Sequence, residues 1–175
     1  KLLVQALSGN NTADILKFNN LTGAVTNFAT ISYFSDMPYG VEFSPDGTKL
    51  YIASLLSFEV LQYDLSSGIP ATIESSSVII GTTAGPGINS GNGALQLGPD
   101  GKIYLAEPTS LFLSCISNPN NLGLSCGFIN DAISLSSGSL VGIGQYGLPN
   151  FIPSLFAPSP ITFTNICVGV PTTFS

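Results

Sequence analysis

The residues that could do chemistry in this chain are mainly acidic, because it has no histidine and only four basic side chains, all of them lysine. Histidine is the commonest general base and metal ligand, so its absence excludes Ser/His/Asp and Cys/His catalytic arrangements. A pair of carboxylates acting as acid and base, as in a glycosidase or lyase, remains open. Four acidic residues fall near the ends of expected strands: Asp36, Glu42, Glu59 and Glu107. Their spacing is not diagnostic, so no catalytic, cofactor-binding or metal-binding residue is assigned.

Three cysteines offer a second kind of chemistry. Cys115 and Cys126 lie 11 residues apart across a segment rich in Asn, Pro and Gly, and Cys167 stands alone. The pair would be free thiols in a reducing compartment and could form a disulfide in an oxidising one. Three cysteines without a histidine fit a zinc site poorly.

Aromatic side chains could form a platform on which sugar rings stack, which keeps carbohydrate binding open. Core packing is the alternative role for them. The candidates are Tyr33, Phe34, Tyr39, Tyr63, Tyr104 and Tyr146.

The composition argues against a nucleic-acid partner. The 175 residues carry a formal net charge of -6, and only 8% of them are charged, against roughly 25% in a typical globular protein. Such a chain has no basic surface to neutralise phosphates. The mean hydropathy is high, at +0.42, yet no continuous apolar stretch is long enough for a membrane span. The chain starts at Lys1 without a signal sequence, and we expect it to be part of a longer protein.

Repeated segments define the expected architecture. Residues 40–53 align with residues 94–106, at an offset of 54 before the one-residue insertion Thr48 and 53 after it. Residues 14–23 align without gaps with residues 59–68, at an offset of 45. Tyr146-Gly147-Leu148 repeats Tyr39-Gly40-Val41 after 107 residues, which corresponds to two periods of about 53 residues. A period of roughly 40 to 50 residues is typical of propeller blades.

Each repeated unit predicts an antiparallel meander of short strands. Apolar residues alternate with polar or small ones in residues 41–43 and 50–52, as in half-buried strands. Pro45-Asp46-Gly47 predicts a tight turn between these strands, and Pro99-Asp100-Gly101 predicts the same turn in the next unit. Asp46 and Asp100 are therefore interpreted as turn residues rather than catalytic acids. Further strands are expected at residues 60–65 and near residues 71–73, and no amphipathic helix is expected.

Four short strands per unit indicate an all-β fold, a β-propeller fragment with about three four-stranded antiparallel blades. A β-sandwich with similar hairpins is the alternative. The expected partial propeller covers residues 1–157, with blades near 10–38, 39–92 and 93–146 and a closing segment at 147–157.

Three segments carry a family resemblance. The Ser-Pro-Asp-Gly-Thr-Lys-Leu-Tyr run at 44–51 is common to many propellers, whereas the Asn-Pro segment at 113–128 and Gly-Leu-Pro-Asn-Phe-Ile-Pro-Ser at 147–154 are more specific. On these the chain resembles the repeat regions of large cell-surface proteins of the Bacteroidetes, which are linked to gliding motility and type IX secretion. Residues 158–175 resemble the start of a PKD domain, an immunoglobulin-like β-sandwich, although the chain stops before the Trp-Asp-Phe-Gly-Asp-Gly run typical of such domains.

The resemblance implies a non-enzymatic structural or adhesion module at the cell surface, without a cofactor. It also implies a disulfide between Cys115 and Cys126. An open arc of blades leaves strand edges unpaired, so the expected partners are other blades or domains of the same long chain, or copies of itself. Surface polysaccharide or protein is a further possible partner. The alternatives are a self-assembling extracellular filament subunit, a carbohydrate-binding propeller, and a paired-carboxylate glycosidase or lyase.

Overall fold

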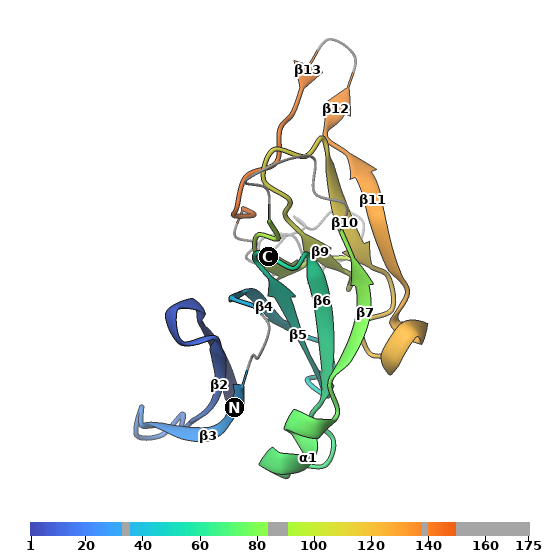
Figure 1. The fold of residues 1–175 in the computed structure, drawn as a ribbon. Helices are drawn as coiled ribbons and strands as arrows, with labels where there is room; N and C mark the ends of the chain where they lie inside the picture. Colours follow the sequence, from blue (N-terminus) through green and yellow to red (C-terminus); the bar gives the residue numbers. More distant parts are fainter. Residues whose placement is uncertain (33–35, 84–90, 138–139, 150–175) are drawn as a thin grey trace, which may run out of the picture.

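The computed structural model describes residues 1–32, 36–83, 91–137 and 140–149. In these ranges the fold is all-β, as predicted, with three antiparallel sheets that stack face to face like propeller blades (Figure 1). The first sheet has the order β1-β2-β3, the second β4-β5-β6-β7 and the third β8-β9-β10-β11. The predicted PKD-like start, residues 158–175, lies outside the described residues.

The first sheet has three strands instead of the expected four. These are β1 (Leu2–Leu7), β2 (Thr12–Phe18) and β3 (Val25–Ser32), with a short 3-10 helix, η1 (Ser8–Asn10), between the first two. The 45-residue repeat aligns β2 with β6 of the second sheet, so β1 corresponds to β5 and β3 to β7. The counterpart of β4, the inner strand, is not found in the described part of the chain.

The second sheet is a four-stranded meander. Its strands are β4 (Pro38–Phe43), β5 (Lys49–Ser54), β6 (Glu59–Asp64) and β7 (Val78–Thr82). The predicted strand near residues 71–73 is wrong, because Pro70–Ser75 forms the short helix α1. Pro70 stands at the start of this helix, where its fixed φ favours helix and its missing N–H is not needed. Ile73 on α1 is buried in the core.

The third sheet repeats the meander with shorter inner strands. Its strands are β8 (Leu95–Leu97), β9 (Ile103–Leu105), β10 (Phe112–Ile116) and β11 (Phe128–Ser134), with the 3-10 helix η2 (Gly123–Cys126) before the last one. A two-stranded hairpin, β12 (Ser136–Ser137) and β13 (Leu140–Val141), follows and projects at the top of the view in Figure 1.

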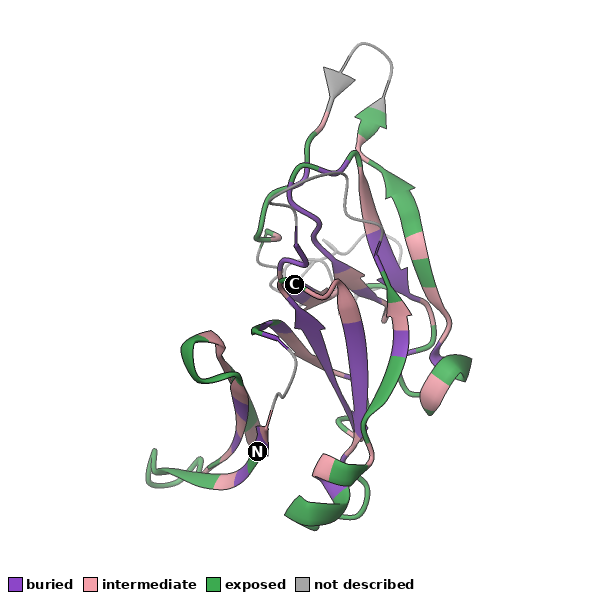
Figure 2. Cartoon of the chain, viewed as in Figure 1, coloured by how far each residue is buried: buried purple, intermediate pink, exposed green. Residues whose placement is uncertain are grey.

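Two hydrophobic cores hold the three sheets together. Strand β5 contributes to both, because successive side chains of a strand point to opposite faces. Leu50 and Ile52 lie in the core shared with the first sheet, and Tyr51 and Ala53 lie in the core shared with the third sheet. All four side chains are fully buried. Figure 2 shows the result, with burial concentrated on the central strands β5 and β6.

The inner strand β4 comes close to β8 and the residues before it because β4 has a glycine, Gly40, at the contact. A Cβ atom on Gly40 would lie 2.4 Å from the carbonyl oxygen of Gly93 and 2.8 Å from the backbone nitrogen of Leu95. Glu42 then joins the same two strands, since its Oε2 accepts a hydrogen bond from the backbone N–H of Leu97 at 2.9 Å. The second and third sheets are therefore connected by backbone contact as well as by apolar packing.

Candidate functional site

The four candidate acidic residues do not form one site. Asp36 and Glu59 are joined through Ser57, whose backbone N–H donates to Asp36 and whose hydroxyl donates to Glu59 at 3.2 Å. Glu42 lies near the other end of β4 from Asp36. Glu107 follows β9 in the third sheet. Within the described ranges, no three His, Cys, Asp or Glu side chains lie close enough to bind a metal ion.

Asp36 has the contacts of a structural anchor. Its carboxylate accepts hydrogen bonds that close the loop between β5 and β6, from the Ser54 hydroxyl and the backbone N–H groups of Leu56 and Ser57. Burial by itself would raise the pKa of Asp36, but these hydrogen bonds, together with one from the backbone N–H of Met37, lower it below its ordinary value. Asp36 therefore stays ionised and occupied by backbone donors, which does not suit a general acid.

Glu107 is the most buried of the four acidic side chains, at 2% exposed. Burial raises the pKa of its carboxyl group, the hydrogen bond from the Ser114 hydroxyl opposes this change, and the nearby Asp131 charge adds to it. A raised carboxyl pKa is what a general acid needs. The carboxylate whose charge acts on Glu107, that of Asp131, accepts a hydrogen bond from Asn130 Nδ2 at 3.0 Å.

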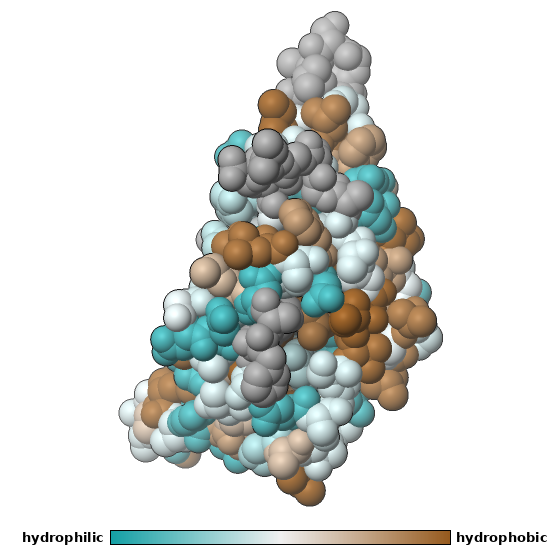
Figure 3. Space-filling model, in the orientation of Figure 1, coloured by the Kyte–Doolittle hydropathy of each residue, from teal (hydrophilic) through white to brown (hydrophobic). Residues whose placement is uncertain are grey.

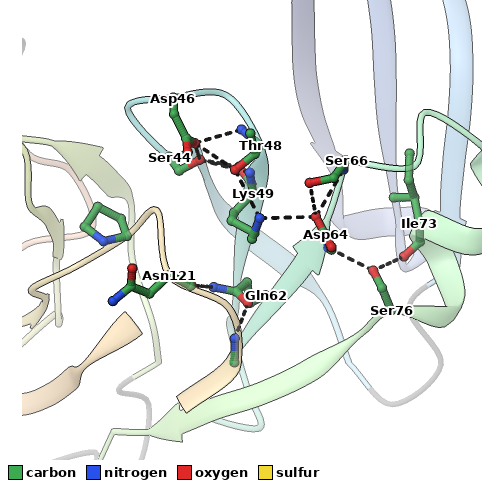
Figure 4. Close-up of polar contacts among 12 residues, drawn as sticks. Ser44, Asp46, Thr48, Lys49, Gln62, Asp64, Ser66, Ile73, Ser76 and Asn121 are labelled. Carbon is green, nitrogen blue, oxygen red and sulfur yellow. Dashed lines mark hydrogen bonds and ion pairs between the residues drawn. The ribbon is translucent and has the colours of Figure 1, made fainter. Parts of the chain in front are cut away.

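The two predicted turns are built alike. Asp46 Oδ1 accepts hydrogen bonds from the Ser44 hydroxyl at 2.6 Å and from the backbone N–H of Thr48 at 2.9 Å, and Gly47 takes a positive φ of 71°. Asp100 accepts from the backbone N–H of Lys102 at 3.3 Å and from the Tyr104 hydroxyl at 2.8 Å, and Gly101 has a φ of 79°. Pro45 and Pro99 precede these residues in the same turns. Both carboxylates thus order their own turns (Figure 4 shows the first).

A buried polar cluster joins the second and third sheets, and we call it the polar clamp. It consists of Tyr51 and Gln62 on the second sheet and the backbone of residues 119–123, the Asn-Pro loop between β10 and β11. The Tyr51 hydroxyl donates to the carbonyl oxygen of Pro119 at 2.7 Å. Gln62 Nε2 donates to the Tyr51 hydroxyl and to the carbonyl oxygen of Asn121, each at 2.7 Å. Gln62 Oε1 accepts from the backbone N–H of Gly123 at 2.7 Å.

The clamp was not predicted from the sequence. Through the 45-residue repeat Gln62 corresponds to Lys17, which is exposed, so its polar type at an alternating strand position indicated a solvent-facing side chain. Gln62 is instead 1% exposed. The cause is the Asn-Pro loop of the third sheet, which covers this part of β6; among the described residues no such loop covers Lys17 on β2.

An ion pair lies at one end of the central strands β5 and β6 of the second sheet. Lys49 Nζ lies 3.2 Å from Asp64 Oδ1, and both residues pair across β5 and β6. Hydrogen bonds from Ser66, with a smaller effect of Lys49, lower the pKa of Asp64. The Ser76 hydroxyl links this strand to α1, since it donates to the carbonyl oxygen of Ile73 at 2.6 Å and accepts from the backbone N–H of Asp64 at 2.8 Å (Figure 4).

The predicted disulfide between Cys115 and Cys126 is not formed, and both residues are buried free thiols. The alternation of strand β10 explains this. Ile116 and Cys126 belong to the core between the second and third sheets, whereas Cys115 is adjacent to Ile116 and points to the opposite face of the sheet, beside Tyr104. The spacing of 11 residues did not reveal that the two thiols lie on opposite faces. Cys167 lies outside the described residues.

Both thiols should be unreactive in the folded protein. Burial raises the pKa of each thiol, so the reactive thiolate is scarce at neutral pH and reagents have little access. In a Cys167→Ser background, Ellman's reagent is expected to detect almost no thiol under native conditions and two thiols after unfolding in guanidinium. A yield of zero thiols after unfolding without reductant would show that a disulfide forms after all.

The aromatic residues do not form a flat platform in the described ranges. Tyr51 and Tyr63 are buried, and Tyr104 is engaged with Asp100. The exposed pair Tyr39 and Tyr146 has ring centroids 5.6 Å apart, but the rings are inclined by 53°. Sugar stacking calls for exposed rings that share a plane, so this pair does not supply such a platform. Tyr33 and Phe34 lie outside the described residues.

No family model and no curated protein matches the chain. Solved structures do show a partial likeness. A protein from Lactobacillus plantarum matches 60% of this chain with 18% identity and a TM-score of 0.43. A calcium-binding protein, regucalcin, from Agrobacterium tumefaciens matches 69% with 17% identity and a TM-score of 0.40. The extracellular domain of a putative one-component system from B. thetaiotaomicron matches 67% with 11% identity and a TM-score of 0.35.

These likenesses are too distant to carry an argument about this chain. The matches cover only 31%, 42% and 15% of the three solved chains, in the order given above. The fold assignment therefore rests on the three stacked antiparallel sheets themselves. In the part of the chain that the structure describes, no helix has the length and apolar character needed to cross a membrane.

Proposed function

We propose that this chain is a non-enzymatic structural module of a large secreted or cell-surface protein. Its role is to hold binding regions in a fixed arrangement for contact with other proteins or polysaccharide. The polar clamp carries the proposal. Three hydrogen bonds of 2.7 Å fix a loop of the third sheet to the buried face of the second, and a fourth, from Gln62 to Tyr51, joins the two side chains that make them. The loop thereby holds the two sheets together.

The acidic side chains also favour a structural role over a catalytic one. Asp36 accepts hydrogen bonds from the loop between β5 and β6, Asp46 and Asp100 accept them from their own turns, and Glu42 connects β4 to β8. The resemblance of residues 113–128 and 147–154 to surface proteins of the Bacteroidetes supports an extracellular location, with gliding and type IX secretion as the biological setting. The low charge favours packing against neighbouring domains or copies, since it weakens electrostatic repulsion.

The test compares two substitutions in the source cells. Gln62→Leu, which releases the Asn-Pro loop, is expected to weaken attachment of the cells to a polysaccharide-coated surface. Glu107→Gln, which removes the one acidic side chain with a raised pKa, is expected to leave attachment unchanged. New reducing ends released from the polysaccharide by the wild-type protein, and lost in a folded Glu107→Gln variant, would contradict the proposal and favour a glycosidase.

A further inference from the structure

The outer face of the third sheet, the face turned away from the second sheet, is apolar and incompletely covered. It contains a hollow of about 200 Å³ lined almost entirely by carbon atoms. The lining residues come from all four strands of the sheet and from the segment that follows: Gln96, Tyr104, Leu113, Ile133, Leu148 and Pro149. Ile133, on the edge strand β11, lines this hollow and is 39% exposed.

The 53-residue repeat relates this face to the side of the second sheet that packs against the third sheet. Tyr104, Leu113 and Ile133 each follow by 53 residues a member of the core between the second and third sheets, namely Tyr51, Val60 and Ile80. Those three side chains are at most 5% exposed, because the third sheet covers them. The outer face of the third sheet therefore has large apolar or aromatic residues at three positions that the second sheet uses to contact its neighbour, while the position of Gln62 is taken by Cys115.

The inner strands repeat in the same way. Gly40 of β4 lies against the backbone of Gly93 and Leu95, and 53 residues later Gly93 lies against the backbone of Tyr146, where an added Cβ would be 2.6 Å from the Tyr146 carbonyl oxygen. The backbone N–H of Ala94 donates to that oxygen at 2.7 Å. The contact of Tyr146 with Gly93, just before β8, therefore repeats the contact of Gly93 and Leu95 with Gly40 on β4. Leu148 and Pro149 follow Tyr146 in sequence and line the hollow.

In a second copy stacked head to tail, the first sheet would meet this hollow with polar side chains as well as with Leu3 and Leu16 on its outer face. On its side turned away from the core, Gln5 and Thr30 both donate to Asp14, at 3.2 and 2.7 Å, and Asn27 donates to Thr30 at 3.2 Å. This polar chain of hydrogen bonds crosses all three strands. Covering the apolar hollow with it would bury polar groups against carbon, which is unfavourable.

We propose that the outer face of the third sheet is the docking surface for a fourth antiparallel sheet of the same polypeptide, joined through an inner strand that begins at Tyr146. The inference rests on the proposed scaffold function and names the partner of the module. The repeat argues for this occupant: the close backbone contact at Gly40 recurs at Gly93, and three core positions of the existing interface are apolar or aromatic again at the open face.

Hydroxyl-radical footprinting tests the proposal by comparing the protein in its source cells with the isolated chain of residues 1–175. Leu113 and Ile133 are expected to be oxidised several-fold less in the cells than in the isolated chain. Ile69, which is 57% exposed at the start of α1, the helix that contacts β3 of the first sheet, is the matched control and should be oxidised equally in both. Equal oxidation of Ile133 in both samples would overturn the proposal.

A second measurement distinguishes the occupants. Light scattering of the isolated chain is expected to give the mass of one chain for the wild type and for Ile133→Lys alike. A dimer that Ile133→Lys dissociates, while Ile69→Lys does not, would overturn the proposal in favour of two copies packed face to face. Failure of the footprinting test leaves the attachment assay for the scaffold function unaffected, so the two results can be told apart.

Discussion

Replacing Gln62 by leucine is expected to lower the free energy of unfolding by roughly 2–4 kcal/mol, because buried partners lose their hydrogen bonds. Leucine is close to glutamine in size, so the change removes polar contacts and leaves little cavity. The Tyr51 hydroxyl loses a donor, the carbonyl oxygen of Asn121 loses its donor, and the backbone N–H of Gly123 loses its acceptor. Urea denaturation followed by fluorescence of the tyrosines measures the effect.

The matched control for this change is Gln145→Leu, because Gln145 is an exposed glutamine in the segment after the hairpin. It is expected to change stability by less than about 0.5 kcal/mol, as most surface substitutions do. If Gln62→Leu proved as mild as Gln145→Leu, the polar clamp would not contribute to the connection between the second and third sheets.

Gly40→Ala is expected to lower the free energy of unfolding by about 2–4 kcal/mol, or to prevent folding. The new methyl carbon would lie 2.4 Å from the carbonyl oxygen of Gly93 and 2.8 Å from the backbone nitrogen of Leu95. These are backbone atoms, so no rotation of a side chain relieves the overlap. The inner strands β4 and β8 would have to move apart, which opens the core between the two sheets and also weakens the contact of Glu42 with β8.

Gly9→Ala is the control for Gly40→Ala, because a Cβ at Gly9 meets no atom within 4 Å. Its stability should be unchanged or slightly raised, since alanine restricts the unfolded chain. Thermal unfolding of both variants measures the difference. A Gly40→Ala protein as stable as Gly9→Ala would mean that the inner strands are not in contact.

The local architecture follows from the sequence where short-range chemistry determines it. The alternation in residues 41–43 and 50–52 and the Pro-Asp-Gly segment between them are sufficient to specify a hairpin, and β4 and β5 pair there with Phe43 opposite Leu50. The same alternation places Leu50 and Tyr51 on opposite faces. It does not say that both faces are buried, because burial depends on the neighbouring sheets.

The helix α1 and the free thiols show two features that residue type and spacing did not predict correctly. Residues 71–73 have the apolar character of a strand, but Pro70 begins a helical turn and Ile73 reaches the core from it. Cys115 and Cys126 are close in sequence, yet the thiols are separated by the sheet itself, because Cys115 is on the face opposite Ile116. Both outcomes depend on how the chain crosses a sheet, which residue spacing alone does not record.

The polar clamp was missed for a similar reason. The Asn-Pro loop carries no charge and no catalytic motif, and its role is to bring backbone carbonyl and N–H groups to a buried glutamine 59 to 61 residues away in sequence. Backbone groups have no sequence signature. A single buried glutamine in a strand becomes informative only when its partners are placed beside it.

The contact between Gly40 and Leu95 tests the stacking of the sheets most directly. The two residues are far apart in sequence and come together only if the second and third sheets pack through their inner strands. A nuclear Overhauser spectrum of the folded chain is predicted to show a strong cross-peak between the Gly40 Hα protons and the backbone amide proton of Leu95. Absence of this cross-peak in a spectrum that resolves both resonances, and shows the cross-strand contacts within each sheet, would contradict the stacked arrangement.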